Sequence, residues 1–320
     1  MNQLTISGSP HVHGNLSVKK IMYMVILALM PAFVVSVYFF GFNAIRVTLI
    51  SVATCVLTEF LIQKYLMKGE CTIGDGSAIL TGILLAFNVP SNIPWWMVVV
   101  GGIVAIGIAK MSFGGLGKNP FNPALVGRVF MLISFPVAMT TWPVPNQNFW
   151  SVDVITGPTT LGLLKEGGAQ AVSGINYWDM LIGNTGGSFG EMCAMALIIG
   201  GLFLIIMKII DWQTPVIIIA TVALVAFIAW YFGEPGKYAN PLYHILSGGL
   251  MLGAFFMATD MVTTPMTIGG KCIFALGVGL ITIIIRLWGQ YPEGMSFAIL
   301  IMNAVVPLIN KGFKPKRFGV

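Results

Sequence analysis

Charged residues are scarce in this 320-residue sequence. Asp, Glu, Lys and Arg together make up 9% of it, against about 25% in ordinary soluble proteins. A soluble chain of this length could not cover its own surface with so few charges, because wide apolar patches would then face water. Hydrophobic residues account for 57%, and the mean hydropathy is +0.88. The composition excludes a soluble domain and indicates an integral membrane protein.

Signatures of metal and nucleotide binding are also missing. The four cysteines lie far apart and no C-x-x-C pair occurs, so neither a zinc site nor an iron–sulfur cluster is supported within this chain. No G-x-G-x-x-G fingerprint follows a strand, and the glycine-rich run at 114–118 lacks the spacing of a phosphate loop. We therefore expect no metal site here, and any NAD chemistry must belong to other chains.

What the sequence does contain is a series of apolar runs, most of them near the roughly 17–25 residues that a helix needs to cross a bilayer. The predicted spans are 21–40, 43–66, 77–90, 95–112, 123–140, 191–209, 214–232, 244–259, 270–287 and 295–310. The predicted fold is an all-α polytopic membrane protein with about ten transmembrane helices. Residues 1–140 form a first five-helix repeat, 141–190 a loop segment, and 191–320 a second five-helix repeat. So long a polar segment as 141–190 indicates function rather than a simple connection.

The basic residues are distributed unequally between the two sides of the membrane. With the N-terminus inside, twelve Lys and Arg residues fall on the inner side and three on the outer side, and Arg46 and Arg128 fall in or beside spans. Because basic loops stay cytoplasmic, both termini are predicted to be cytoplasmic and 141–190 to lie outside. Four tryptophans then lie at the outer interface, where indole rings prefer to be: Trp95, Trp96, Trp142 and Trp150.

A faint internal repeat accompanies the spans. Residues 81–87 resemble 252–258, an offset of about 171, and the same offset places 122–124 over 293–295. Five spans per half is an odd number, so the second copy would be inverted in the bilayer, as in many transporters. The alternative is that apolar helices simply look alike.

Two carboxylates fall in or beside the predicted spans. Glu59 lies inside the second span and Asp260 at the inner end of the eighth. A carboxylate in a bilayer is costly and indicates an ion path or a buried partner, for which Arg128 is one candidate. The other interpretation is a carboxylate that reaches the interface, which fits Asp260 better than Glu59. Glu59 is the candidate ion-path residue.

The most informative segment is 153–161, Asp-Val-Ile-Thr-Gly-Pro-Thr-Thr-Leu. Gly157 and Pro158 predict a turn, and three threonines offer hydroxyls on a polar loop that a modifying enzyme could reach. An ordinary turn stabilised by these hydroxyls is the alternative. A further prediction concerns Ser188 and Glu191, whose spacing is typical of a capping box at the start of the sixth span.

The pattern D-x-x-T-G-P-T resembles the D-x-x-[S/T]-G-A-T signature at which a flavin transferase attaches FMN to a threonine through its phosphate. Pro158 stands where the signature has Ala. Ser9-Pro10-His11, the run 118–124 and the run 187–191 resemble further landmarks of the same family in the same order. The family is the D subunit of the Rnf complex, homologous to the B subunit of the sodium-pumping NADH:quinone reductase. The short N-terminal segment favours the Rnf branch.

This resemblance implies a subunit of a ferredoxin:NAD⁺ oxidoreductase that exports Na⁺ or H⁺, in a bacterial inner (cytoplasmic) membrane. The chain would not be catalytic alone and would have no catalytic residue. It would carry electrons through covalent FMN on Thr159, with Asp153, Thr156 and Gly157 completing the attachment motif; Thr160 is the alternative acceptor. A non-covalent riboflavin is a possible second cofactor. The partners would be the other Rnf subunits, the flavin transferase and the bilayer, with no nucleic acid.

Two other functions fit the residues. A solute channel or transporter would share the inverted repeat but carry no flavin. A structural scaffold of a redox complex would also carry no flavin.

Overall fold

The computed structural model describes residues 17–68, 71–145, 155–234 and 236–314. Within these ranges the regular secondary structure is helical apart from a single two-stranded sheet. Six helical segments are long and apolar enough to cross a membrane: Val18–Phe40 (α1), Phe42–Met67 (α2 and η1), Trp95–Phe113 (α4, η3 and η4), Gln213–Phe232 (α10), Ile268–Trp288 (α13) and Met295–Gly312 (α14). A multi-pass membrane protein is thereby confirmed.

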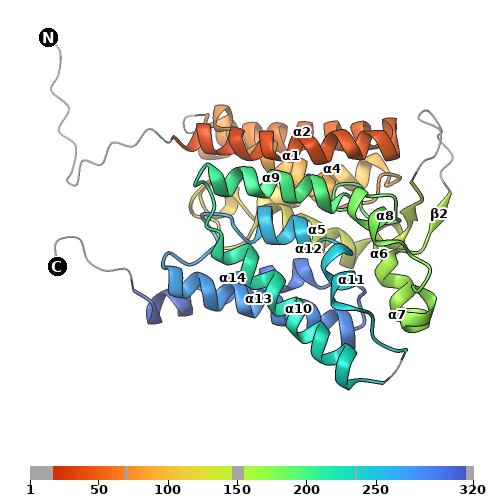
Figure 1. Ribbon diagram of the computed structural model, residues 1–320. Coiled ribbons are helices and arrows are strands. Elements are labelled where there is room, and N and C mark those ends of the chain that lie inside the picture. The colour runs from red at the N-terminus through yellow and green to blue at the C-terminus, as the bar shows by residue number, and fades with distance from the viewer. Residues whose placement is uncertain (1–16, 69–70, 146–154, 235, 315–320) are drawn as a thin grey trace, which may run out of the picture.

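Shorter apolar helices pack among these long ones: Ser77–Phe87 (α3), Pro123–Ser134 (α5), Ala194–Ile206 (α9), and the pair Leu250–Leu252 (α12) and Gly253–Met257 (η5). Figure 1 shows α1, α2 and α4 along one side of the bundle and α10, α13 and α14 along the other, with α5, α9 and α12 between them. The interior of the bundle is therefore built from half-length helices, whose ends lie inside the protein. The predicted count of ten spans and the inverted repeat stay predictions.

The remaining elements gather at one end of the bundle, here called the α7 end (Figure 1). They are Pro136–Thr140 (α6), Trp142–Pro143 (β1), Thr156–Gly157 (β2), Thr160–Ala171 (α7), Tyr177–Ile182 (α8) and Pro241–Leu246 (α11). Helix α1 begins and α14 ends at the opposite end (Figure 1). Two short 3-10 turns, Ile73–Asp75 (η2) and Met111–Phe113 (η4), connect longer helices.

Local sequence explains where several helices begin. Asn122 and Asn240 each accept a hydrogen bond from the second residue of the following helix, and each is followed by a proline at the first helical position. A proline there costs nothing, because its missing N–H would have no partner inside the helix. Asn-Pro therefore fixes the starts of α5 and α11.

Other breaks interrupt predicted spans. The fifth span was predicted as 123–140, but α5 ends at Ser134 and Pro136 begins α6. Proline cannot continue a helix because it lacks an N–H and its ring clashes with the preceding turn. The eighth span, predicted as 244–259, is broken at residues 247–249, where Gly248 has φ of 65°.

Close helix packing depends on small residues. A Cβ on Gly82 would lie 2.7 Å from the Cα of Val52, so α3 can approach the backbone of α2 only because residue 82 has no side chain. The Ser51 hydroxyl donates to the Gly82 carbonyl at 2.7 Å across the same contact. This packing holds the half-length α3 in the interior, next to the sites described below.

Candidate functional site

The threonine motif lies at the α7 end and is held by the two-stranded sheet. Trp142 pairs with Gly157 and Pro143 with Thr156, in antiparallel register. Asp153 lies outside the described residues. Thr159 then precedes α7, and its hydroxyl oxygen accepts a hydrogen bond from the Gly162 N–H at 3.0 Å. The motif thus runs from a strand into the N-terminus of a helix.

The two neighbouring threonines differ in their surroundings. Thr160 is buried, with 7% of its surface exposed, and its carbonyl accepts a 2.6 Å hydrogen bond from the Tyr243 hydroxyl. Thr159 is only half-buried. A modifying enzyme needs access to the hydroxyl, so the burial favours Thr159 as the acceptor.

A cavity of about 310 Å³ opens beside Thr159, within the range of small-molecule sites. Its walls come from the motif, from the loop before α9, from the break between α11 and α12, and from the start of α14. Aromatic and apolar side chains alternate there with polar ones: Leu132, Met139, Trp142, Thr159, Leu161, Glu166, Ser188, Glu191, Met192, Leu246, Ser247, Tyr291, Glu293, Ser296 and Phe297. We call it the outer cavity.

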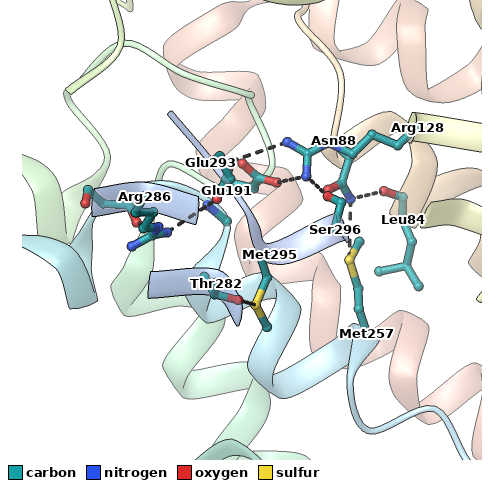
Figure 2. Close-up of polar contacts among 12 residues, drawn as sticks. Leu84, Asn88, Arg128, Glu191, Met257, Thr282, Arg286, Glu293, Met295 and Ser296 are labelled. Atoms are coloured by element: carbon teal, nitrogen blue, oxygen red, sulfur yellow. Dashed lines mark hydrogen bonds and ion pairs between the residues drawn. The ribbon is translucent and has the colours of Figure 1, made fainter. Parts of the chain in front are cut away.

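Four charged side chains lie close together beside the outer cavity (Figure 2). Three of them line it, Arg128, Glu191 and Glu293, and Arg286 lies next to Glu293. We call these four residues the charged cluster. Arg128 lies 3.3 Å from a Glu293 oxygen and 3.7 Å from a Glu191 oxygen. Arg286 lies 3.5 Å from Glu293. Arg128 also donates to the Ser296 hydroxyl. Two positive and two negative charges thus balance in a region where isolated charge would be costly.

The charged cluster is tied to the backbone of the break between α11 and α12. Arg286 donates to the carbonyls of His244 at 2.6 Å and Ser247 at 3.0 Å. The Gly249 N–H donates to Glu293. A Cβ on Gly249 would lie 2.5 Å from a Glu191 oxygen, so glycine is required for the carboxylate to approach this closely. The charges therefore replace the hydrogen bonds that the broken helix has lost.

The predicted capping box is wrong. Helix α9 begins at Ala194, and its N-cap is Cys193, whose sulfur accepts from the Ala196 N–H. Glu191 lies before the helix, and its carboxylate faces the charged cluster instead. Glu191 faces Arg128 because a charged guanidinium stabilises a buried carboxylate more than a backbone N–H does.

Glu59 lies far along the chain from its partner, and that partner is not Arg128. Lys110 Nζ lies 2.6 Å from a Glu59 oxygen and 2.7 Å from the Ser77 hydroxyl, and both charged side chains are almost fully buried. Gln63 donates to the other Glu59 oxygen at 3.1 Å. Glu59 is therefore a buried, paired carboxylate, and Lys110 lies inside the bundle with it.

A second cavity adjoins this ion pair. It is smaller, about 90 Å³, and is lined mainly by apolar side chains together with Lys110, Asn119, Asn122 and Asp260. The Asn119 side-chain oxygen is buried without a hydrogen-bond partner. Asp260 accepts from the Val262 N–H and the Thr263 hydroxyl within its own turn. We call it the inner cavity.

Arg286, Glu293 and Ser247 carry no sequence pattern that marks them as site residues. Arg286 lies at the outer end of the ninth predicted span and Glu293 just before the tenth, so nothing local distinguishes them from interfacial residues. Arg286, like Lys110, is buried beside a carboxylate.

Thr159 lines the outer cavity and lies at the N-terminus of the twelve-residue helix α7, an arrangement in which a phosphate on its hydroxyl would face free backbone N–H groups. The lining residues of this cavity include Glu191, whose oxygen without a hydrogen bond lies 3.7 Å from Arg128, and Ser247, whose hydroxyl is buried without a hydrogen-bond partner. Together the aromatic and polar residues of the wall suit a ligand with both planar apolar and hydrogen-bonding surface.

Known proteins of similar sequence are D subunits of ion-translocating oxidoreductase complexes. The chain is 48% identical to the D subunit of the proton-translocating ferredoxin:NAD(+) oxidoreductase complex of Clostridium ljungdahlii, over 99% of this chain and 97% of that protein. It is 46% identical to the Na(+)-translocating counterpart of Acetobacterium woodii, over 100% and 97%. It is 39% identical to the D subunit of the ion-translocating oxidoreductase complex of Stutzerimonas stutzeri, over 95% and 92%. The model of the NQR2, RnfD, RnfE family matches residues 5–319, and the chain belongs to this family.

Proposed function

We propose that this chain is the D subunit of an ion-translocating ferredoxin:NAD⁺ oxidoreductase and carries electrons through FMN covalently bound to Thr159. The full-length similarity to D subunits supports the assembly. The observation that carries the flavin assignment is the position of the Thr159 hydroxyl, half-buried at the edge of a 310 Å³ cavity and at the start of α7. FMN would supply the electron-transfer chemistry, and the protein would position it and tune its potential.

The residues around Thr159 fit a phosphoester. The phosphodiester formed by attachment keeps one negative charge, which the free N–H groups at the start of α7 stabilise. The Thr160 carbonyl is anchored to Tyr243 and β2 to β1, so the attachment point is held on both sides. Thr156 and Gly157 act here as structural residues that present Thr159.

The walls of the outer cavity fit a planar aromatic ring. Trp142, Tyr291 and Phe297 offer ring surfaces, and Tyr291 stacks on Phe297 with centroids 5.3 Å apart. Lys165 on α7 donates to the Tyr291 carbonyl at 2.6 Å, which ties α7 to the opposite wall. In this proposal these contacts exclude water from one face of the bound cofactor.

We propose a non-covalent riboflavin as a second cofactor without assigning it a site, because the inner cavity, about 90 Å³, is smaller than the roughly 300 Å³ of ordinary small-molecule sites.

For the membrane arrangement we propose ten spans in two inverted five-helix halves, with both termini in the cytoplasm of a bacterial cell and the α7 end outside. Corresponding pairs pack in both halves, α2 on α4 and α10 on α13. The first and last helices of each half meet across the halves, α1 with α9 and α5 with α14. The flavin transferase would then reach Thr159 from the outer side.

Ion coupling is assigned to the whole complex, with Glu59 as this chain's candidate ion-path residue. The two relatives named for different ions, H⁺ and Na⁺, are almost equally similar to this chain, so transport assays should measure both. Ferredoxin and NAD⁺ would bind other Rnf subunits, because this sequence has no dinucleotide fingerprint.

In-gel fluorescence tests the proposal. The full chain, produced together with a flavin transferase and purified, should show flavin fluorescence that survives denaturation, and trypsin should release a fluorescent peptide containing Thr159. A colourless chain under these conditions would refute the flavin assignment and favour a solute channel or a scaffold.

A further inference from the structure

A third cavity, of about 370 Å³, lies at the end of the bundle opposite α7. Its wall includes Met266, whose N–H donates to the side chain of Asn310 near the end of α14. The volume is within the range of ordinary small-molecule sites. Polar and apolar side chains both line it, among them Asp211, Thr214, Thr264, Lys271, Met261 and Met266. We call it the α13 cavity.

One ion pair lines the α13 cavity. Asp211 lies just before α10, Lys271 is the fourth residue of α13, and the Lys271 ammonium donates to the Asp211 carboxylate. This bond uses one of three N–H donors and one of two carboxylate oxygens. The side chains are 49% and 25% exposed, for Asp211 and Lys271 respectively. Both charges are therefore accessible, and each has hydrogen-bonding capacity left for a ligand.

The α13 cavity lies at the level of a membrane surface. Helices α10 and α13 are both long and apolar enough to cross a bilayer, so the residues where they begin lie at its boundary. Trp212, beside Asp211, is 56% exposed, and indole rings prefer the interface. A Cβ on Gly279 would lie 2.7 Å from the Thr221 side chain, so close packing holds the two helices together. The ion pair thus lies where lipid headgroups lie.

We infer that the α13 cavity binds the headgroup of a zwitterionic phospholipid, phosphatidylethanolamine, with its phosphate on Lys271 and its ammonium on Asp211. The cavity presents one positive and one negative charge, and this headgroup carries one of each. A purely anionic headgroup would meet the Asp211 carboxylate. The acyl chains would lie along Met261 and Met266, which line the same cavity and are 54% and 76% exposed. The inference does not depend on the flavin.

The two charged side chains should affect lipid selectivity differently. Asp211→Asn removes the negative charge with little change of shape, so the preference should pass from phosphatidylethanolamine to anionic phosphatidylglycerol. Lys271→Met should weaken binding of both lipids, because both phosphates lose their partner. We expect each dissociation constant to change roughly two- to fivefold, the range that exposed ion pairs support. Phosphatidylcholine should bind the parent more weakly, since its quaternary ammonium has no N–H to donate to Asp211.

The experiment is native mass spectrometry of the purified full chain in detergent. The added lipids are phosphatidylethanolamine, phosphatidylglycerol and phosphatidylcholine in equal amounts and with the same acyl chains. The matched control removes the same two charges from an exposed ion pair outside the cavity, in Glu234→Gln and Lys237→Met, and should retain lipids as the parent does. Melting temperatures of all variants in lipid-free detergent verify that they are folded.

Equal retention of the three lipids by the parent, or a preference for phosphatidylglycerol, would overturn the inference and leave the cavity to a partner subunit. An unchanged preference for phosphatidylethanolamine in Asp211→Asn would overturn it as well, because Asp211 would then not bind the ammonium. If Lys271→Met does not fold, the change of preference in Asp211→Asn decides alone.

Discussion

Lys110 and Glu59 form an ion pair inside the bundle, with 2.6 Å between Nζ and the carboxylate oxygen and side-chain exposures of 2% and 1%. They are 51 residues apart in the chain and come from the ends of two different long helices. Neither charge has access to water. Removing one of them therefore leaves the other uncompensated, which bears directly on how an ion-path role for Glu59 can be tested.

The first prediction concerns this pair. Glu59→Gln and Lys110→Met should each lower stability by about 3–5 kcal/mol, because each leaves a buried charge without its partner. The double variant should recover most of this loss. Thermal unfolding of the four proteins in one detergent measures it. A loss of stability in the double variant that equals either single loss, or their sum, would contradict the prediction.

The ion-path role is then tested in the double variant, where folding is preserved. Redox-driven ion uptake by the assembled complex in vesicles should be impaired if Glu59 carries the ion. Full coupling in the stable double variant would mean that Glu59 serves only to neutralise Lys110.

The second prediction distinguishes the two threonines. Thr159→Asn should abolish covalent FMN but keep the helix cap, because Asn caps as well as Thr and has no hydroxyl. Thr160→Val, the matched control, should keep the flavin. Tryptic peptide masses report both. FMN found on residue 160 of the Thr159→Asn chain would move the attachment point.

The third prediction concerns the glycine that faces the charged cluster. An added Cβ in Gly249→Ala would lie 2.5 Å from Glu191 and 3.0 Å from Glu293, so the carboxylates must move. Overpacking of this kind costs about 1–3 kcal/mol. Gly174→Ala is the control, because a Cβ there meets nothing within 4 Å. Equal melting temperatures for the two variants would show that the cluster adapts freely.

The fourth prediction is the topology. Reporter fusions after Lys68 and Lys118 and at the C-terminus should report cytoplasm, and fusions near Lys165 and Lys237 should report the outer side. The expectation follows from the excess of basic residues on the inner side. The excess of basic residues on the inner side stays nearly the same when the buried Lys110 and Arg286 are left out of the count. A cytoplasmic signal near Lys165 would contradict both the predicted orientation and the proposed position of Thr159 on the outer side.

The sequence by itself determined that the chain lies in a membrane and where most of its helices run. Apolar runs of bilayer length admit few alternatives, because every backbone group must find a partner within the segment. Asn122-Pro123 marked the start of α5, since both residues act on the adjacent turn. The motif at 153–159 could be recognised for the same reason: its spacing is local, and Thr156, Gly157 and Thr159 lie together in the fold.

Only the tertiary structure decided which charges meet. Arg128 finds Glu293 165 residues away, and Glu59 finds Lys110 rather than Arg128. No local pattern encodes such pairs, because they depend on how the half-length helices end inside the bundle. The structure likewise directed Glu191 away from the start of α9 and into the outer cavity. A buried carboxylate pairs with the strongest hydrogen-bond donor near it, and the fold decides which donors are near.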